Sequence, residues 1–93
     1  MLSEICKEIF LCKIERVSTE VRAPDTNGIV NYDISSLGLD SKPAHVSLTL
    51  ESANVCCRYD WDNSTKDTLK LFFFDTNGNP VTWLIRFGIT IFN

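Results

Sequence analysis

The residues best suited to bind a ligand form a short run in which aromatic and polar side chains alternate. The run holds two aromatic residues, two carboxylates and an amide: Tyr59, Asp60, Trp61, Asp62 and Asn63. Sugars stack the C–H faces of their rings on aromatic side chains, while carboxylate and amide groups bind the hydroxyls. Trp61 has polar residues on both sides, so it is the best candidate in the chain for an exposed platform that binds a glycan. The favoured interpretation is nevertheless that Trp61 fills one end of the core, the commoner role of large aromatic residues.

The other chemistry-bearing residues form no catalytic or metal-binding motif. His45 is the only histidine, and a catalytic triad or a histidine-based zinc site would need further partners. The chain has no Gly-x-Ser-x-Gly elbow, phosphate-binding loop or dinucleotide fingerprint. Asp60 and Asp62 start like a calcium loop, but the glycine and glutamate required further along that loop are missing. The sequence therefore predicts a protein that is not an enzyme and that binds no metal or cofactor.

The cysteines do not have the spacing of a zinc site or a disulfide framework. They are Cys6, Cys12, Cys56 and Cys57, with no Cys-x-x-Cys pair among them. Two adjacent cysteines in a strand point to opposite faces and rarely pair with each other. We expect reduced thiols, as in proteins made in a cytosol.

Charge and hydropathy disfavour two classes of partner. The net charge is −3 and the lysines and arginines are scattered, which disfavours binding to nucleic acid. The longest apolar runs are only a few residues, too short to cross a membrane. No basic segment precedes an apolar one at the N-terminus, which predicts synthesis in the cytoplasm without a signal peptide. A chain of 93 residues makes one domain.

The tetrapeptide Asp-Thr-Asn-Gly occurs twice, at residues 25–28 and 75–78. Asp begins a type I turn well because its carboxylate accepts from backbone N–H groups, and Asn and Gly tolerate the positive φ that closes a hairpin. Two such turns in a short chain predict antiparallel β-structure.

Six segments have the alternation or the β-branched and aromatic composition of strands. They are residues 17–23, 29–34, 45–50, 55–61, 68–74 and 81–92. In the first, Val17, Thr19 and Val21 alternate with polar residues, which predicts one wet face. We expect Leu37 and Leu39, in the loop after the second segment, to reach the core. The fold class is an all-β, antiparallel, jelly-roll-like sandwich of about six strands over residues 13–93.

Residues 1–12 form a separate segment before this domain. Their apolar residues have helical spacing and include a short heptad-like ladder: Leu2, Ile5, Cys6, Ile9, Phe10 and Cys12. This pattern predicts a short N-terminal helix, with an extended arm as the alternative.

The last two strand segments carry more apolar side chains than one sheet face needs. Such a strand is buried on both faces, lies at the centre of a sheet, or meets a partner subunit. The candidates for an oligomer interface are Phe72, Phe74, Phe87, Ile89 and Ile91.

From Gly28 to the end, the chain resembles the small β-sandwich domains at the C-terminal ends of bacteriophage tail fibres and minor tail proteins. The matching stretches are GIVNYDISSLGL at 28–39, KPAHVSL at 42–48, RYDWDNST at 58–65, LKLF with DTNGNP at 69–80, and RFGITI at 86–91. The resemblance implies a homotrimeric structural module of a phage or prophage tail that recognises a bacterial surface glycan. It implies no particular binding residue.

Two other functions remain open. One is a stand-alone, lectin-like carbohydrate-binding domain. The other is a small intracellular interaction protein that captures a peptide along an exposed strand edge. Oligomeric state separates the tail module from the interaction protein.

Overall fold

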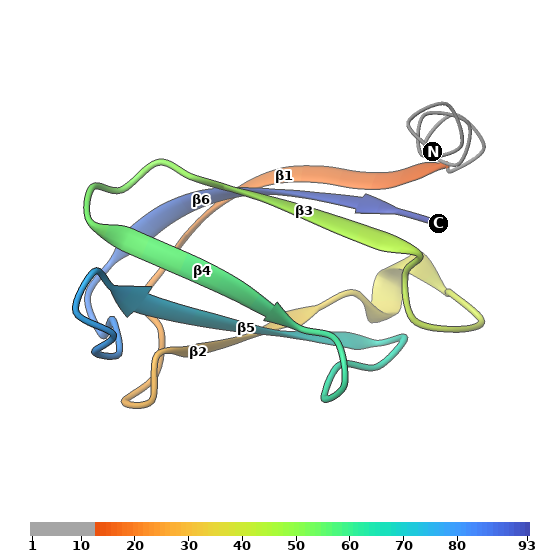
Figure 1. The fold of residues 1–93 in the computed structure, drawn as a ribbon. Coiled ribbons are helices and arrows are strands. Elements are labelled where there is room, and N and C mark those ends of the chain that lie inside the picture. The colour runs from red at the N-terminus through yellow and green to blue at the C-terminus, as the bar shows by residue number, and fades with distance from the viewer. Residues whose placement is uncertain (1–12) are drawn as a thin grey trace, which may run out of the picture.

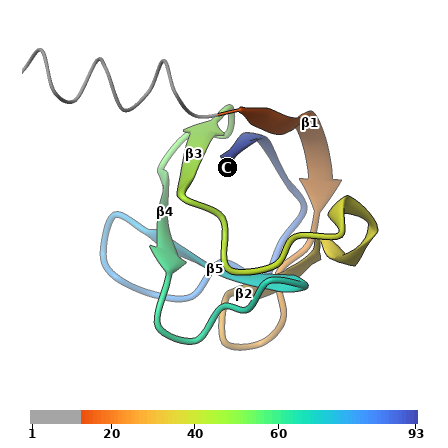
Figure 2. The ribbon, with the colours of Figure 1, turned by 90° about the vertical axis from the view of Figure 1, so that its right-hand side faces the viewer.

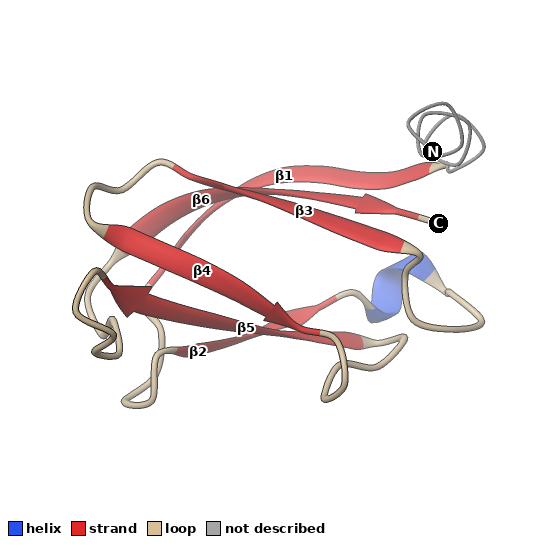
Figure 3. Ribbon diagram, in the orientation of Figure 1, coloured by secondary structure: helices blue, strands red, loops and turns tan. Residues whose placement is uncertain are grey.

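The computed structural model describes residues 13–93. Six strands form two three-stranded antiparallel sheets that pack face to face (Figure 1). The strands are β1 (Ile14–Arg22), β2 (Ile29–Asp33), β3 (His45–Leu50), β4 (Val55–Asp60), β5 (Thr68–Asp75) and β6 (Ile85–Phe92), and one 3-10 turn, η1 (Ser35–Leu37), follows β2 (Figure 3). The expected all-β sandwich is confirmed. The helix or arm expected for residues 1–12 lies outside the described residues.

The strand order is that of a small jelly roll. One sheet has the order β1-β6-β3 and the other has the order β2-β5-β4. β1 pairs with β6 and β2 pairs with β5, both antiparallel, so strands of the first half of the chain pair with strands of the second half. Figure 2 looks along the roll and shows the two sheets curling around the interior.

The two central strands supply most of the core. Their inward residues are almost completely buried: Leu69, Leu71 and Phe73 on β5, and Ile85, Phe87, Ile89 and Ile91 on β6. The rings of Phe73 and Phe87 meet across the interface with centroids 4.9 Å apart. Burial of each such side chain contributes about 1.5–3 kcal/mol, so these residues close the sandwich within a single chain. Leu37 and Leu39 contact this core from the loop after β2, as expected.

The predicted first strand is confirmed, although β1 starts three residues earlier, but the predicted orientation is wrong. Ser18 lies opposite the buried Ile89, and direct partners in an antiparallel pair share a face. The polar residues therefore point toward the other sheet, while Val17 and Val21 are 70% and 55% exposed on the outside. The register of β1 against β6 decides which face of β1 lies inside, and this register cannot be predicted from the sequence of β1 alone.

Hydrogen bonds compensate for the inward position of these polar side chains. Glu20 accepts from the Ser18 hydroxyl at 2.6 Å and from Arg22 Nη2 at 2.7 Å. Arg16 donates to the Asp33 carbonyl at 3.2 Å and to Ser36 Oγ at 2.7 Å. Because β1 is an edge strand, the long arginine side chains can lie over Tyr32 and still reach the surface.

The two repeated turns have nearly the same geometry. In each, the aspartate carboxylate accepts two backbone N–H groups: Asn27 at 2.8 Å and Ile29 at 2.9 Å in the first, Asn77 and Asn79 at 2.9 Å in the second. The turn chemistry is as expected, but the predicted hairpins are wrong in one respect. Each turn lies in a connection between strands of opposite sheets, the first directly before β2 and the second directly after β5.

The last strand starts later than expected, at Ile85. Before it, Pro80 bridges to Phe74, and the amide of Val81 donates to the Phe73 carbonyl at 3.0 Å. These bonds keep the chain on the β2-β5-β4 sheet until it crosses to the other sheet. In a strand over 81–92, alternation would place Trp83 on the same face as Ile85, but Trp83 lies before β6 and is 50% exposed.

Candidate functional site

The predicted glycan platform lies in the connection from β4 to β5, at the end of the sandwich that carries η1 (Figure 1). Trp61 is 54% exposed, so it does not fill the end of the core. However, Lys42 Nζ lies 3.9 Å from the centroid of the Trp61 ring and donates to the Trp61 carbonyl at 2.8 Å. Lys42 therefore covers part of the ring and ties two loops together.

The polar residues beside Trp61 mainly hold the loop. Asn63 Nδ2 donates to Asp60 Oδ2 at 2.8 Å, and this bond is the main reason that the pKa of Asp60 is lowered. The Ser64 hydroxyl donates to the Asp60 carbonyl at 2.6 Å and accepts from the Lys70 amide at 2.9 Å. Of the carboxylates and amides predicted for the platform, Asp62 alone has a side chain without a hydrogen-bond partner in residues 13–93. The Asp60 and Asn63 side chains thus hold each other in place, and Asp62 keeps its full hydrogen-bonding capacity.

Tyr59 is not part of the platform. It pairs with the buried Leu71 and shares its inward face. Its hydroxyl is buried without a hydrogen-bond partner in the described part of the chain, and burial raises the pKa of the Tyr59 phenol. Cys57, two residues earlier on the same face, has its pKa raised by burial to about 12, so its thiol stays protonated at neutral pH. The sequence prediction missed this orientation.

The predicted interface residues divide into two groups. Phe87, Ile89 and Ile91 are at most 1% exposed in one chain, so they belong to its own core and cannot form a contact between subunits. Their apolar character reflects the central position of β6, one of the alternatives considered above. Phe72 and Phe74 instead point outward from β5 and remain partly exposed.

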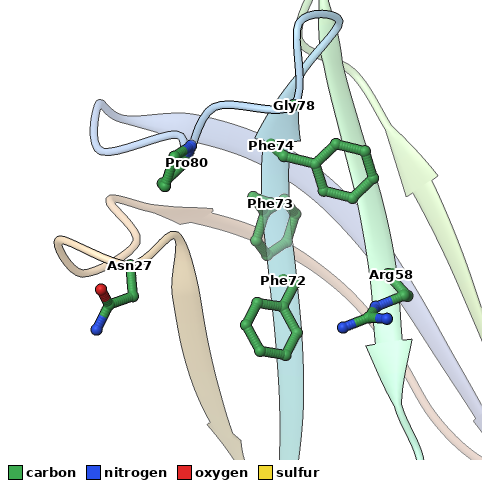
Figure 4. Close-up of a pocket in the computed structure, with 7 residues that line it drawn as sticks. All are labelled: Asn27, Arg58, Phe72, Phe73, Phe74, Gly78 and Pro80. Atoms are coloured by element: carbon green, nitrogen blue, oxygen red, sulfur yellow. The ribbon is translucent and has the colours of Figure 1, made fainter.

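Phe72 and Phe74 line a pocket on the outer face of the β2-β5-β4 sheet (Figure 4). The pocket has a volume of about 280 Å³. It is lined by Asn27, Arg58, Phe72, Phe73, Phe74, Gly78 and Pro80. Both repeated turns thus contribute a residue, since Asn27 belongs to the first and Gly78 to the second. The pocket combines an aromatic floor with a guanidinium group and an amide.

The packing of the first repeated turn helps to shape this pocket. Gly28 has a φ of +77° and its carbonyl accepts from the Phe73 amide at 2.7 Å. A Cβ at this position would overlap the Phe73 carbonyl oxygen and would approach Pro80. The absence of a side chain at Gly28 therefore lets the turn lie directly against β5, which places Asn27 at the rim.

Sequence reasoning named Phe72 and Phe74 but missed Arg58 and Asn27 as their neighbours. Arg58 is the cross-strand partner of Phe72, a relation that depends on the register of β4 against β5. Asn27 is more distant in sequence and reaches the pocket only through the crossing between sheets. The signal in the chain is the run of Phe72, Phe73 and Phe74, because alternation along a strand places Phe72 and Phe74 on the face opposite to Phe73.

Other features of the described residues point to no further site. Across residues 13–93, no three His, Cys, Asp or Glu side chains come together in a way that could hold a metal ion. No helix within that range is long and apolar enough to cross a membrane. His45 lies at the start of β3 with its ring 5.8 Å from that of Phe92.

Comparisons of the chain with protein families, with curated proteins and with solved structures find no match.

Proposed function

We propose that this protein is a non-catalytic recognition domain that binds a glycan in the pocket around Phe72, as a homotrimeric module of a phage or prophage tail. The observation that carries the proposal is the composition of the pocket: two half-buried aromatic rings beside a guanidinium group and an amide. Aromatic faces bind the apolar side of a sugar ring, and planar polar groups bind its hydroxyls. A volume of about 280 Å³ suits a single sugar residue at the end or within a chain.

The Phe72 pocket is a better candidate than the Trp61 loop for three reasons. Its aromatic residues lie on a strand within a sheet, and sites on such rigid elements are better defined than sites on loops. The guanidinium of Arg58 has no polar partner among residues 13–93, whereas Asp60 and Asn63 bind each other. Its surface is also concave, which allows a ligand to be contacted from several sides.

The test is binding to a glycan array by the wild type and by two single-alanine variants. We expect Phe72→Ala to reduce binding by at least about tenfold, since it removes the ring on which the sugar stacks. Trp61→Ala should reduce it by less than about twofold. Thermal unfolding of each variant checks that both remain folded.

Three results would contradict the proposal or its location. Loss of binding with Trp61→Ala but not with Phe72→Ala would move the site to the Trp61 loop. Equal binding by both variants and the wild type would exclude both sites. A wild type that binds no glycan would overturn the recognition of sugars.

A second candidate function, peptide capture, is favoured by β1. This strand pairs with β6 on one side only, and its outward valines are exposed. An extended peptide could add a strand along its free edge. If the chain is a monomer, a peptide-display selection should enrich peptides that bind the wild-type protein but not the variant Thr19→Pro. The glycan proposal predicts no such enrichment.

A further inference from the structure

Two cations on the outer face of the β2-β5-β4 sheet lack polar partners. Arg58 and Lys70 have no side-chain hydrogen bond or ion pair within the described residues. Every other basic residue in residues 13–93, apart from the single histidine, has such a partner. These partnered residues are Lys13, Arg16, Arg22, Lys42, Lys66 and Arg86.

Both cations lie beside the same aromatic ring. Arg58 Cζ is 5.1 Å and Lys70 Nζ is 5.5 Å from the centroid of Phe72. Arg58 also lines the pocket, on the β4 side of Phe72 (Figure 4). Arg58 pairs across the strands with Phe72, and Lys70 is two residues from Phe72 on the same face of β5. The pair therefore gives a local positive charge to one edge of the pocket, although the chain as a whole carries −3.

The carboxylates in this region do not neutralise the two cations by direct contact. Asp25 and Asp75 accept backbone N–H groups of their own turns. Asp60, the cross-strand partner of Lys70, accepts a hydrogen bond from Asn63 and forms no ion pair within 4.0 Å. Asp60 keeps its negative charge, and its attraction to Lys70 and Arg58 helps to lower its pKa. The two cations therefore have no direct partner and, with Asp60 counted, leave one net positive charge beside the pocket.

We infer that the ligand of the Phe72 pocket is an acidic sugar whose ring carries a carboxylate, such as a uronic acid. This inference rests on the proposed binding of a glycan. The apolar face of the ring would pack on Phe72 and Pro80. The carboxylate would accept two parallel hydrogen bonds from the Arg58 guanidinium, whose planar fork matches it, with Lys70 adding a second positive charge.

The experiment uses the folded chain and pairs of oligosaccharides that differ in one group. Glucuronate, galacturonate and mannuronate oligosaccharides are each compared with their carboxyl-reduced, neutral forms by titration calorimetry. We expect the acidic form of at least one pair to bind about tenfold or more tightly than its neutral form. This preference should shrink when NaCl is raised from 20 mM to about 500 mM, because salt screens exposed charges.

Three variants locate the effect. Arg58→Gln should remove most of the preference for the acidic form, and Lys70→Gln should remove part of it. Arg58→Lys should restore it only in part, since a lysine keeps the charge but lacks the planar fork. Arg86→Gln is the matched control, because Arg86 is an exposed cation of the other sheet that pairs with Glu51. It should leave the preference unchanged.

The outcomes separate this inference from the proposed function. Equal binding of acidic and neutral forms, with loss in Phe72→Ala, would overturn the acidic ligand and support glycan binding. Tighter binding of sulfated oligosaccharides than of uronates would contradict the inference that the ligand carries a carboxylate. A preference that Arg58→Gln leaves intact would place the charge recognition elsewhere and overturn the inference. Binding of no member of either set would overturn both proposals.

Discussion

Gly28 and Gly78 occupy the same position in identical tetrapeptides, yet their surroundings differ. Both have a left-handed backbone, with φ values of +77° and +84°. At Gly78 an added Cβ would meet nothing within 4 Å, whereas at Gly28 it would overlap the Phe73 carbonyl oxygen. Gly78 is therefore required only by the turn, whereas Gly28 is required by the turn and by its close contact with β5.

This difference predicts unequal effects of alanine at the two positions. Gly78→Ala should lower the free energy of unfolding by about 1–2 kcal/mol, the cost of a left-handed conformation for a residue with a Cβ. Gly28→Ala should lower it by about 2–5 kcal/mol, because the backbone of β5 must also move. Urea denaturation of both variants measures the two values. Equal values would show that the contact between Gly28 and β5 contributes nothing.

Glu20 offers a test of the polar inner face of β1 by pH. Its pKa is lowered, first by the Ser18 hydroxyl and further by Arg22, while burial acts in the opposite direction. A carboxyl group whose pKa is lower in the folded state stabilises that state above its ordinary pKa of 4.5, and the stabilisation is lost as the pH falls below that value. Glu20→Gln should therefore make the decline in stability between about pH 5 and pH 3 shallower.

The measurement is the free energy of unfolding from urea titrations across that range. Ser18→Ala removes the largest cause of the lowered pKa while keeping the carboxyl group, so it should also make the decline shallower, to a smaller extent. Asp33 and Asp60, whose pKa values are lowered as well, keep part of the acid dependence in both variants. A decline in Glu20→Gln as steep as in the wild type would show that Glu20 faces water, as the alternation in β1 first predicted.

At the scale of elements, local patterns predicted the strands well and their partners poorly. β3 begins and ends where alternation predicted, because Val46, Leu48 and Leu50 contact the core and the residues between them do not. β1 has equally regular alternation, but its polar side chains face inward. The difference arises because β1 is an edge strand, where polar side chains that point inward can form hydrogen bonds and still reach solvent. The position of β1 in the sheet cannot be predicted from its own sequence.

The candidate site shows the same limit. A core position is the favoured prediction for Trp61, and it is wrong, because the side chain is exposed. The position of Lys42 against its ring depends on two loops that are distant in sequence. Phe72 and Phe74 were recognised as apolar surplus on β5. Their combination with Arg58 and Asn27 requires the register of β4 against β5 and the crossing of the chain between sheets. Residue types could be predicted from the chain, whereas the grouping of these residues could not.

At the scale of the whole molecule, two exposed valines on one sheet face offer a surface that a second copy could cover. The core is closed within one chain, so Phe87, Ile89 and Ile91 no longer argue for an oligomer. The outer face of the β1-β6-β3 sheet instead exposes Val17 and Val21, and β-branched side chains on a sheet face suit packing against another sheet. This face lies on the sheet opposite to the Phe72 pocket, so a trimer built on it would leave the pocket open.

The proposed trimer therefore predicts which substitutions dissociate it. Sedimentation equilibrium should give the mass of three chains for the wild type and of one chain for the double variant Val17→Glu, Val21→Glu. Each of the three chains would then bring two carboxylates to the interface, and removing these like charges from water would oppose association. Unfolding of the double variant should stay close to that of the dissociated wild type, because both valines are exposed in a single chain. Phe72→Ala, on the pocket side, is the matched control and should remain trimeric.

The possible results of that experiment discriminate between the functions. A wild type that is monomeric at all concentrations removes the trimer and leaves a stand-alone lectin-like domain or peptide capture at β1. A trimer that dissociates with Phe72→Ala, but not with the valine variant, would mean that the pocket is the contact between subunits, and no glycan could then enter it. A trimer that depends on Val17 and Val21 and binds glycans through Phe72 assigns one sheet to assembly and the other to recognition, as a tail module requires.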